Sequence, residues 1–290
     1  MLSAIKLLFG RPKRFCQRVF RWFPVLYQVR GSRLSDKFTL ITSALLSPFY
    51  CFYRLDHWQD PVLLRDSFVD VKGVGSFFLK ARTDELYHVC PFRESHVMSA
   101  ISKYLRHGEV FIDAGANIGF YSILASSLVG PSGLVIAVGM IESTASSLKY
   151  NIELNGASNI LIEQAALTSK TDPNINAFFR RGSLGQASLA NVDMIGSVAL
   201  SCESVRTISL SEILKEFQEI SILKMDLEGS ELDALLSAGE NLRKINIIIF
   251  ELLNSSDISL LTFLNDHGYF LERLDGRNFL AKKHLIDLPK

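Results

Sequence analysis

The sequence has few cysteines, and they lie far apart. Its four cysteines are Cys16, Cys51, Cys90 and Cys202, and none forms a Cys-x-x-Cys pair. Four scattered cysteines without such a pair favour neither a disulfide framework nor a cysteine zinc site. A reducing compartment fits this usage best, and we expect a cytoplasmic protein.

The N-terminal segment also lacks an apolar run long enough to cross a membrane. The segment from Phe38 to Tyr53 carries no charge over 16 residues, but it contains Pro48. A membrane-spanning helix needs about 20 apolar residues, so we expect none here. Basic residues interrupt the early apolar region, which excludes a secretory signal pattern. No internal repeat and no Ser/His/Asp arrangement are visible, and the six histidines are scattered.

The composition favours a well-packed globular chain with uneven charge. Hydrophobic residues make up 48% and charged residues 21% of the 290 residues, so a sizeable core is possible. Residues 1–60 hold ten Lys/Arg and three Asp/Glu, whereas the remainder holds 21 and 27. Because phosphate binding needs a basic face, the net negative remainder predicts no nucleic-acid partner.

Residues 1–60 are basic and aromatic and predict a helical N-terminal extension. One interpretation places this extension on an anionic membrane surface as a peripheral contact, or against a lipid-linked substrate. The alternative is a pair of helices that pack on the main domain and expose a basic face to water. The sequence leaves both open, and it predicts that residues 61–290 form the main domain and fold without the extension.

The most informative stretch runs from Glu109 to Ser122. An apolar run, residues 110–112, predicts a buried strand, and an apolar helix is expected from Tyr121 onward. Asp113 and three small or turn-forming residues lie between them: Gly115, Asn117 and Gly119. A strand that leads into a helix through such a turn is typical of the first βα unit of a nucleotide-binding sheet.

The residue types of this turn favour S-adenosylmethionine (SAM) over NAD. The turn is not Gly-x-Gly-x-x-Gly, because an acid, Asp113, leads it. A helix N-terminus rich in glycine suits a pyrophosphate, whereas an acid suits a ligand that carries positive charge. SAM has an ammonium and a sulfonium and no phosphate. A tight βα turn with an ordinary aspartate cap is the structural alternative.

Strands and helices alternate after this turn, which predicts a parallel sheet covered by helices on both faces. The expected strands after the first are residues 134–138, 160–162, 222–226, 245–250, 269–274 and 278–281. The last two predict an antiparallel pair around Asp275-Gly276. Residues 168–206 break the alternation and predict an inserted hairpin and loop, with β-like runs at 176–180 and 197–202. A further hairpin is expected at residues 68–80, around Gly73-Val-Gly75.

Three motifs resemble the FkbM family of SAM-dependent methyltransferases. They are Asp113-Ala-Gly-Ala-Asn-Ile-Gly119, Lys149-Tyr-Asn-Ile-Glu-Leu-Asn-Gly156 and Leu223-Lys-Met-Asp-Leu-Glu-Gly-Ser-Glu231. The similarity runs from about residue 66 to residue 282. It implies an α/β class I methyltransferase (Rossmann-like) fold, with a seven-stranded, mostly parallel sheet and a reversed last strand. It also implies methyl transfer to an oxygen of a sugar, a lipid-linked glycan or a polyketide-like acceptor.

The sequence departs from the family pattern at two places. Family members carry Glu-Pro at the end of the second strand, where the acid binds the ribose hydroxyls, but Gly139 and Met140 stand here. Glu142 follows and is the candidate replacement. Before the helix that precedes the fourth strand, Ser211 replaces the usual aspartate, and serine caps a helix well.

The glycine turn, the three motifs and the resemblance to the family together give a set of candidate site residues. The cofactor-binding candidates are Asp113, Gly115, Asn117 and Gly119 at the methionine end, Phe120 and Tyr121 beside it, Glu142 near the ribose, and Gln164 and Ala165 near the adenine. The catalytic candidates are Asp226 and Glu228, because a carboxylate at a strand end can take the proton of an acceptor hydroxyl.

Structural interpretations stay open for the acids. In these, Lys224 pairs with an acid, Glu228 caps a turn, Glu231 stabilises the first turn of a helix, and Glu251 meets water at a strand end. No metal site is predicted, since no His or Cys joins Asp226 and Glu228 at ligand spacing.

The leading function is therefore SAM-dependent O-methylation of a sugar, glycan or lipid-linked acceptor. A second hypothesis is a methyltransferase-like domain that has lost affinity for SAM and acts as a binding or scaffold module; Gly139 motivates it. An NAD-dependent oxidoreductase is disfavoured, because Gly-x-Gly-x-x-Gly and an acid at the end of the second strand are both missing.

Overall fold

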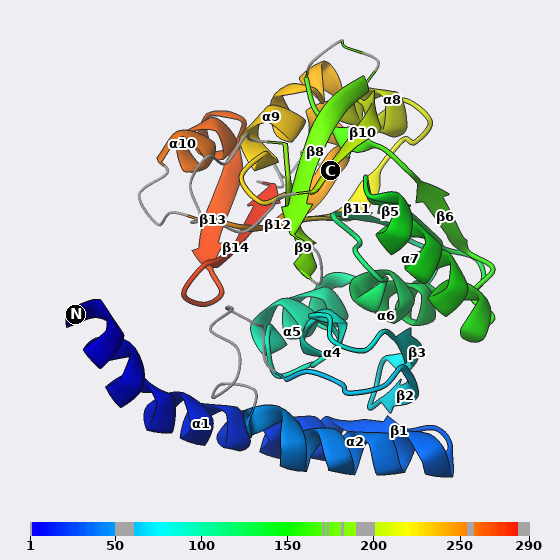
Figure 1. Ribbon diagram of the computed structural model, residues 1–290. Helices are drawn as coiled ribbons and strands as arrows, with labels where there is room; N and C mark the ends of the chain where they lie inside the picture. The colour runs from blue at the N-terminus through cyan, green and yellow to red at the C-terminus, as the bar shows by residue number, and fades with distance from the viewer. Residues whose placement is uncertain are drawn as a thin grey trace. The chain divides into compact units, whose positions relative to one another are not determined.

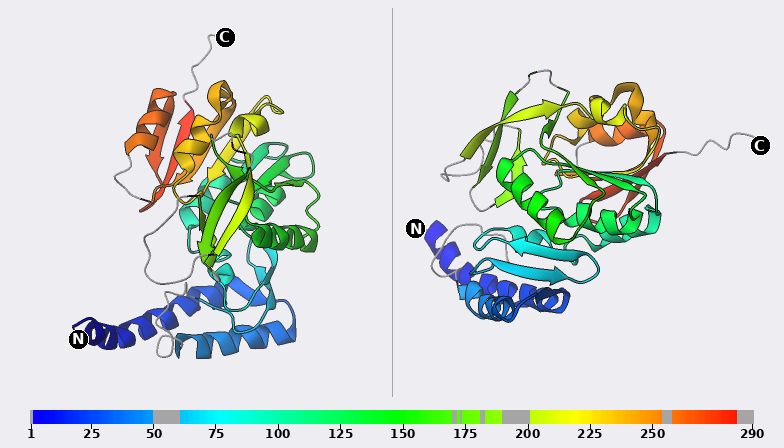
Figure 2. Two further views of the ribbon diagram at one scale, coloured as in Figure 1. Left: turned by 45° about the horizontal axis from the view of Figure 1, so that its top comes forward. Right: turned by 90° about the vertical axis from the view of Figure 1, so that its right-hand side faces the viewer.

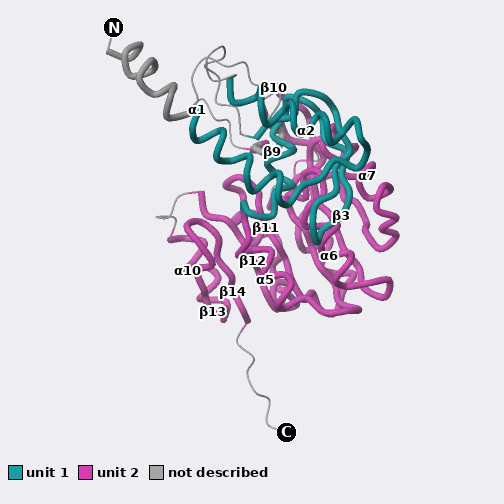
Figure 3. Tube along the Cα trace, turned by 90° about the horizontal axis from the view of Figure 1, so that it is seen from below, with its two compact units in different colours: residues 1–93, 181–185 teal, residues 94–180, 186–290 magenta. Residues whose placement is uncertain are grey.

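A computed structural model describes residues 2–49, 61–169, 172, 174–180, 183–189, 201–253 and 258–283. The chain divides into two compact units (Figure 3). The first unit comprises residues 1–93 and 181–185, and the second comprises residues 94–180 and 186–290. Residues 50–60 of the expected extension and the expected strand start at 197–200 lie outside the described residues.

The second unit is built on a seven-stranded sheet with the order β13-β14-β12-β11-β4-β5-β6. The strands are β4 (Val110–Ala114), β5 (Leu134–Val138), β6 (Ile160–Glu163), β11 (Ile220–Met225), β12 (Ile245–Glu251), β13 (Tyr269–Arg273) and β14 (Asn278–Lys283). The central pairs are parallel, and β14 runs antiparallel to both of its neighbours. This order, with its reversed last strand, confirms the predicted class I methyltransferase fold.

Helices cover both faces of this sheet (Figures 1 and 2). On one face lie α5 (Ser95–Tyr104), α6 (Phe120–Val129) and α7 (Glu142–Leu154), and on the other α8 (Leu210–Leu214), α9 (Glu231–Leu236) and α10 (Ile258–Asp266). The strands have near-continuous apolar runs because both faces are buried. The core between the sheet and α8 to α10 includes Leu223, Ile248 and Phe250, all with no exposed surface. A short 3₁₀ helix, η2 (Gly239–Lys244), leads into β12.

The inserted segment forms a second, four-stranded sheet rather than a simple hairpin. Its strands are β7 (Ala166–Leu167), β8 (Asn174–Arg180), β9 (Ser183–Ser188) and β10 (Ser201–Ile208), in the order β7-β10-β8-β9. β10 pairs antiparallel with β8 and parallel with β7. The two residues of β7 thus form the strand with which β10 pairs, and so short a strand leaves no pattern in the sequence.

The first unit combines helices with a small three-stranded sheet. It contains α1 (Leu2–Gln28), β1 (Val29–Gly31), α2 (Leu34–Leu46), η1 (Ser47–Phe49), β2 (Ser67–Val71), β3 (Gly75–Leu79) and α4 (Glu85–His88). The predicted hairpin at residues 68–80 is β2 and β3. None of the described helices is both long enough and apolar enough to cross a membrane.

The compact units divide between Arg93 and Glu94, whereas the sequence predicts a boundary at residue 60. The physical reason is strand pairing. β1 forms an antiparallel pair with β2, with Val29 opposite Val71, so a cut at residue 60 would divide one sheet. Residues on both sides of the sequence-based boundary therefore share one sheet.

Candidate active site

Three acids follow or end neighbouring strands at one edge of the large sheet. Asp113 lies near the end of β4, Asp226 directly follows β11, and Glu251 ends β12. Lys224 is in register with Asp113, and Met225 is in register with Phe250. Because the carboxyl ends of parallel strands meet at one edge, this register brings the acids together where ligands bind in open α/β sheets.

The glycine turn after β4 is held close to β11 and β5. The amides of Gly115 and Ala116 both donate to the carbonyl of Val138, at 2.9 Å. Gly115 has φ +87°, and a Cβ there would lie 2.0 Å from the carbonyl oxygen of Asp226. Asn117 (φ 49°) and Gly119 (φ 98°) are left-handed as well. The turn therefore requires glycine where it meets the strand that carries Asp226.

Asp113 is a buried part of this framework. Its Oδ2 accepts a hydrogen bond of 2.6 Å from Ser122, and Lys224 Nζ lies 3.9 Å from its Oδ1. Burial raises the pKa of the Asp113 carboxyl, while Lys224 and Ser122 oppose that shift. Oδ1 is buried and accepts no hydrogen bond from the described residues. With 1% of its surface exposed, Asp113 has almost no area for direct contact with a cofactor.

Lys224 connects the acids to α6, the helix that follows the glycine turn. Its ammonium lies 3.4 Å from Asp226 Oδ2 and 4.9 Å from the centre of the Tyr121 ring. The Tyr121 hydroxyl donates to Glu94 Oε2 at 2.6 Å, and the Phe120 ring packs edge-on against Tyr121. Lys224 thus pairs with acids, as its structural interpretation predicts, and it also ties β11 to α6.

Glu94, Asp226 and Glu251 form a cluster of carboxylates, whose nearest oxygens all lie within 4.8 Å of one another. Burial, followed by the charges of Asp226 and Glu94, raises the pKa of Glu251. Three carboxylates are suitable ligands for a hard cation such as Mg²⁺. However, two of these carboxylates already have protein partners: Glu94 accepts a hydrogen bond from Tyr121, and Glu251 pairs with Arg277 at 3.4 Å.

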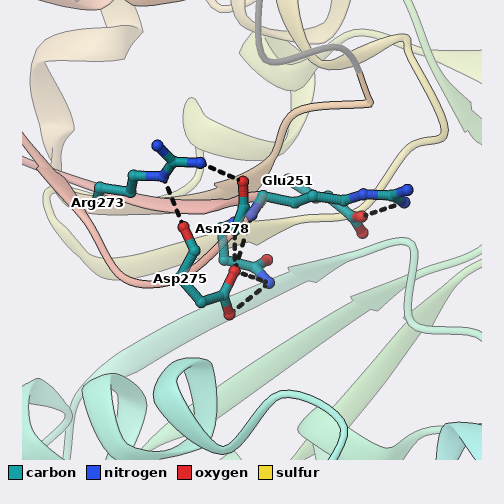
Figure 4. Close-up of polar contacts among 6 residues, drawn as sticks. Glu251, Arg273, Asp275 and Asn278 are labelled. Atoms are coloured by element: carbon teal, nitrogen blue, oxygen red, sulfur yellow. Dashed lines mark hydrogen bonds and ion pairs between the residues drawn. The ribbon is translucent and has the colours of Figure 1, made fainter.

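A tight turn lies beside Glu251, one member of this cluster (Figure 4). Between β13 and β14, Arg273 Nε donates to the carbonyl of Asp275, and Asn278 donates to the Asp275 carboxylate. This is the Asp275-Gly276 turn that the sequence predicts. The next residue, Arg277, supplies the cation that faces Glu251, so the turn positions a counter-charge at the edge of the site.

The loop after β11 gives Glu228 and Glu231, the other two acids of the Leu223–Glu231 motif, different contacts. Glu231 accepts from the amides of Leu227 (2.8 Å) and Gly229 (3.1 Å), so its carboxylate closes the loop that precedes α9. Glu228 has φ 51°, and its carbonyl accepts from the Ser188 hydroxyl of β9. The inserted sheet therefore reaches the loop that carries the candidate acid Glu228.

Gly139 follows β5, the second strand of the large sheet in chain order. A Cβ on Gly139 would meet no atom of the described residues within 4 Å, and the φ of Gly139 is not left-handed. Glu142, exposed at the start of α7, donates its backbone amide to Glu203 Oε1 at 3.0 Å. After β6, Gln164 is exposed and Ala165 is buried. Glu203, from β10, thus holds a carboxylate at the start of α7, the helix that follows Gly139 in the chain.

Sequence reasoning missed two of these acids. Glu94 precedes α5 and is far from Asp226 in the chain, so no local pattern connects them. Glu203 lies in the inserted segment, where patterning predicts only β-like runs. By contrast, the structure brings the predicted residues Tyr121 and Asp226 together around Lys224.

The residues at this edge fit SAM. Among the described residues, no protein atom lies within 4 Å of a Cβ placed on Gly139, which leaves space after β5. Two exposed polar side chains follow β5 and β6: Glu142 begins α7, and Gln164 comes directly after β6. The acids nearby suit a cationic ligand rather than a phosphate.

Residues 113–271, more than half of the chain, match the Methyltransferase FkbM domain. A search of curated proteins gives no match. Among solved structures, a methyltransferase FkbM from Methylobacillus flagellatus is 17% identical, covering 68% of this chain and 53% of that chain at a TM-score of 0.42. A SAM-dependent O-methyltransferase from Thermotoga maritima is 13% identical, covering 76% and 78% at a TM-score of 0.41.

A precorrin-6y C5,15-methyltransferase from Geobacter metallireducens is 15% identical, covering 65% of this chain and 89% of that chain at a TM-score of 0.42. These structural similarities are weak, so the assignment depends on the domain match together with the strand order and the motifs. On these grounds the chain belongs to the FkbM family of SAM-dependent methyltransferases.

Proposed function

We propose that this methyltransferase methylates a hydroxyl oxygen of a sugar, glycan or lipid-linked acceptor, and that Asp226 takes the hydroxyl proton. The observation that carries the proposal is the position of Asp226. Its side chain is 20% exposed, follows β11 directly, and lies beside the glycine turn, where Gly115 approaches its carbonyl. Bound SAM would supply an activated methyl group at this edge.

An acceptor hydroxyl must lose its proton as the new C–O bond forms, and a carboxylate within reach can accept that proton. Lys224, 3.4 Å from Asp226, fixes the orientation of the carboxylate and offsets part of the charge of the acidic cluster. Asp113 acts indirectly as a positioning residue, because its carboxylate lies 3.9 Å from Lys224 Nζ and accepts a hydrogen bond from Ser122.

The acidic cluster also favours an acceptor with several hydroxyls. Carboxylate oxygens accept hydrogen bonds from hydroxyl donors, and Glu94, Asp226 and Glu251 offer such oxygens within 4.8 Å of one another. The same negative charge repels the phosphates of nucleic acids. These features support a sugar-like acceptor over an RNA base.

For the cofactor, we assign the methionine end to the turn residues Gly115, Asn117 and Gly119, with Phe120 and Tyr121 beside them. Gln164 and Ala165 border the adenine end. The ribose hydroxyls are assigned to Glu142 or Glu203, since the usual acid is replaced by Gly139. Glu203 has one oxygen on the amide of Glu142, which holds its carboxylate at the start of α7.

Asp226→Asn tests the catalytic assignment. The variant keeps the size of the side chain but cannot act as the base, so methyl transfer should slow by roughly 10²–10⁴-fold while SAM affinity changes little. Turnover is measured as S-adenosylhomocysteine formed with a panel of sugars and lipid-linked glycans, and affinity by calorimetry. Asp266→Asn, the same change on an exposed residue of α10, is the matched control.

Normal turnover in Asp226→Asn would return this residue to a structural role, and loss of SAM binding would make it a cofactor residue. A wild-type protein that binds neither SAM nor S-adenosylhomocysteine would favour the second function, a scaffold module. Gly139 is the observation behind that alternative.

A further inference from the structure

Two helices of the first unit carry large apolar side chains on their outer surface. The side chains are 54% to 83% exposed, and we call them the outer apolar stripe: Phe20, Phe23 and Tyr27 on α1, with Leu34, Phe38, Ile41 and Leu45 on α2. The α2 members recur at intervals of four, three and four residues, so they share one face of the helix.

The two helices lie side by side and are fixed to each other. Trp22 Nε1 of α1 donates to Ser47 Oγ after α2 at 3.0 Å, and the rings of Phe15 and Phe49 are 5.1 Å apart. Figure 2 shows both helices along the same side of the first unit. The stripe is therefore displayed by a hairpin whose arms are held together.

The polarity of α2 is reversed relative to an ordinary surface helix. Its buried residues are Asp36, Thr39, Leu40 and Ser43, three of which are polar. Ser43 accepts from the amide of Leu64, Thr39 donates to the carbonyl of Ser35, and Asp36 accepts from the amide of Arg33. A surface helix normally buries its apolar stripe and exposes its polar residues.

This reversal means that packing within the unit does not explain the stripe. The buried polar residues of α2 are satisfied by hydrogen bonds, and the apolar residues are left to water. Contiguous exposed apolar patches of this kind mark interaction surfaces.

The charges around the stripe are of one sign. Between residues 15 and 49 the cations are Arg18, Arg21, Arg30, Arg33 and Lys37, and the only acid is Asp36, which is buried. The surface thus combines apolar side chains with cations and has no exposed acid in this segment. That combination is typical of helices that lie in the interface of anionic membranes.

We propose that the outer apolar stripe inserts into the interfacial region of a lipid bilayer that contains anionic lipids, with the neighbouring cations at the level of the headgroups. A second copy of the chain fits less well. A two-fold symmetric interface would place the same patch on both sides, so the cations of each copy would face those of the other without acids to pair with.

The mode of contact is interfacial. No described helix can span a bilayer, and α2 has only 13 residues. The apolar contribution to binding comes from the area of the stripe and the electrostatic contribution from anionic headgroups. This inference is independent of the methylation reaction and does not depend on the acceptor proposed above.

Vesicle co-sedimentation of the full-length protein tests the proposal. We expect binding to vesicles of phosphatidylcholine with phosphatidylserine, and weaker binding to phosphatidylcholine alone. High salt should weaken the first without abolishing it, since salt screens the charges but not the apolar insertion. The double variant Phe38→Ser with Ile41→Ser should lower the partition coefficient at least about tenfold.

Two further variants separate the contributions. Arg21→Gln with Lys37→Gln should weaken binding to the anionic vesicles by about fivefold per charge and leave binding to neutral vesicles unchanged. Phe270→Ser is the matched control, because Phe270 is 64% exposed but lies on β13 of the other unit. It should bind as the wild type does.

A tryptophan probe protects the test against misfolding of the serine variant. Phe38→Trp should shift its emission to the blue when anionic vesicles are added. The proposal is overturned by an unshifted emission, by wild-type binding of the serine variant, or by wild-type protein that stays in the supernatant with both vesicles. A dimer in sedimentation velocity that the serine variant dissociates, without vesicle binding, would identify a second copy as the partner instead.

Discussion

At the scale of single residues, Gly139 has the clearest consequence for the cofactor. The family's acid at this strand end would accept hydrogen bonds from both ribose hydroxyls, and bonds to a charged group contribute about 1.5–3 kcal/mol each before the loss of water is counted. The structure removes the main conformational objection to restoring it. Gly139 is not in the left-handed region, and within the part of the chain that the structure describes no atom lies within 4 Å of a Cβ placed there.

We predict that Gly139→Glu tightens SAM binding by roughly one to two decades, since about 1.4 kcal/mol is a factor of ten. Isothermal calorimetry with SAM and S-adenosylhomocysteine measures the change. Glu142→Gln and Glu203→Gln are the companions. Whichever of them weakens binding identifies the carboxylate that now contacts the ribose, and Gly139→Glu should then add little.

If neither glutamine variant nor Gly139→Glu changes a tight wild-type affinity, the ribose is bound by other groups and the assignment of Glu142 and Glu203 is wrong. Binding that is absent in the wild type and present in Gly139→Glu would favour the scaffold function.

At the scale of elements, the turn between β4 and α6 links the cofactor side of the site to Asp226. Gly115→Ala should be costly for two reasons: its φ of +87° and the 2.0 Å approach of a Cβ to the Asp226 carbonyl. Gly156→Ala is the matched control, because Gly156 has φ +61° and a Cβ there would meet no described residue within 4 Å. The control should lose only the left-handed penalty, about 1–2 kcal/mol.

We expect Gly115→Ala to lower the free energy of unfolding by roughly 1–3 kcal/mol more than Gly156→Ala does, as is typical of overpacked sites. Urea unfolding followed by circular dichroism measures both free energies of unfolding. SAM binding should fall in Gly115→Ala and persist in Gly156→Ala. Equal stabilities would mean that the turn can move away from β11, which would weaken the argument that it is rigidly coupled to Asp226.

At the scale of the whole molecule, the division at Arg93 and Glu94 changes which fragment should fold. The sequence predicts that residues 61–290 fold alone, because both main motifs and the seven strands of the large sheet lie inside. However, that fragment keeps β2 and β3 and removes β1, so the edge of β2 loses its partner. Unpaired strand edges promote aggregation.

We therefore predict that residues 94–290 give one cooperative thermal transition, and that residues 61–290 are less soluble and prone to aggregate. Calorimetry and light scattering compare the two fragments with the full chain. A soluble, cooperative 61–290 fragment would support the boundary at residue 60. An uncooperative 94–290 fragment would mean that the large sheet depends on the first unit.

Local pattern alone determined much of this protein. Continuous apolar runs located the seven strands, and the Asp275-Gly276 turn located the final antiparallel pair. The glycine turn and the motif around Asp226 indicated the family. These features are encoded within a few residues, because strand burial, turn conformation and left-handed glycines depend on local sequence.

Tertiary structure alone decided which distant groups meet. It brought Glu94 and Glu251 to Asp226, set Lys224 between Asp113 and Asp226, and placed Glu203 at the start of α7. It also paired β1 with β2 and turned the polar side of α2 inward. Strand order, register and helix orientation bring these residues together, and such long-range pairings leave no periodic trace in a single sequence.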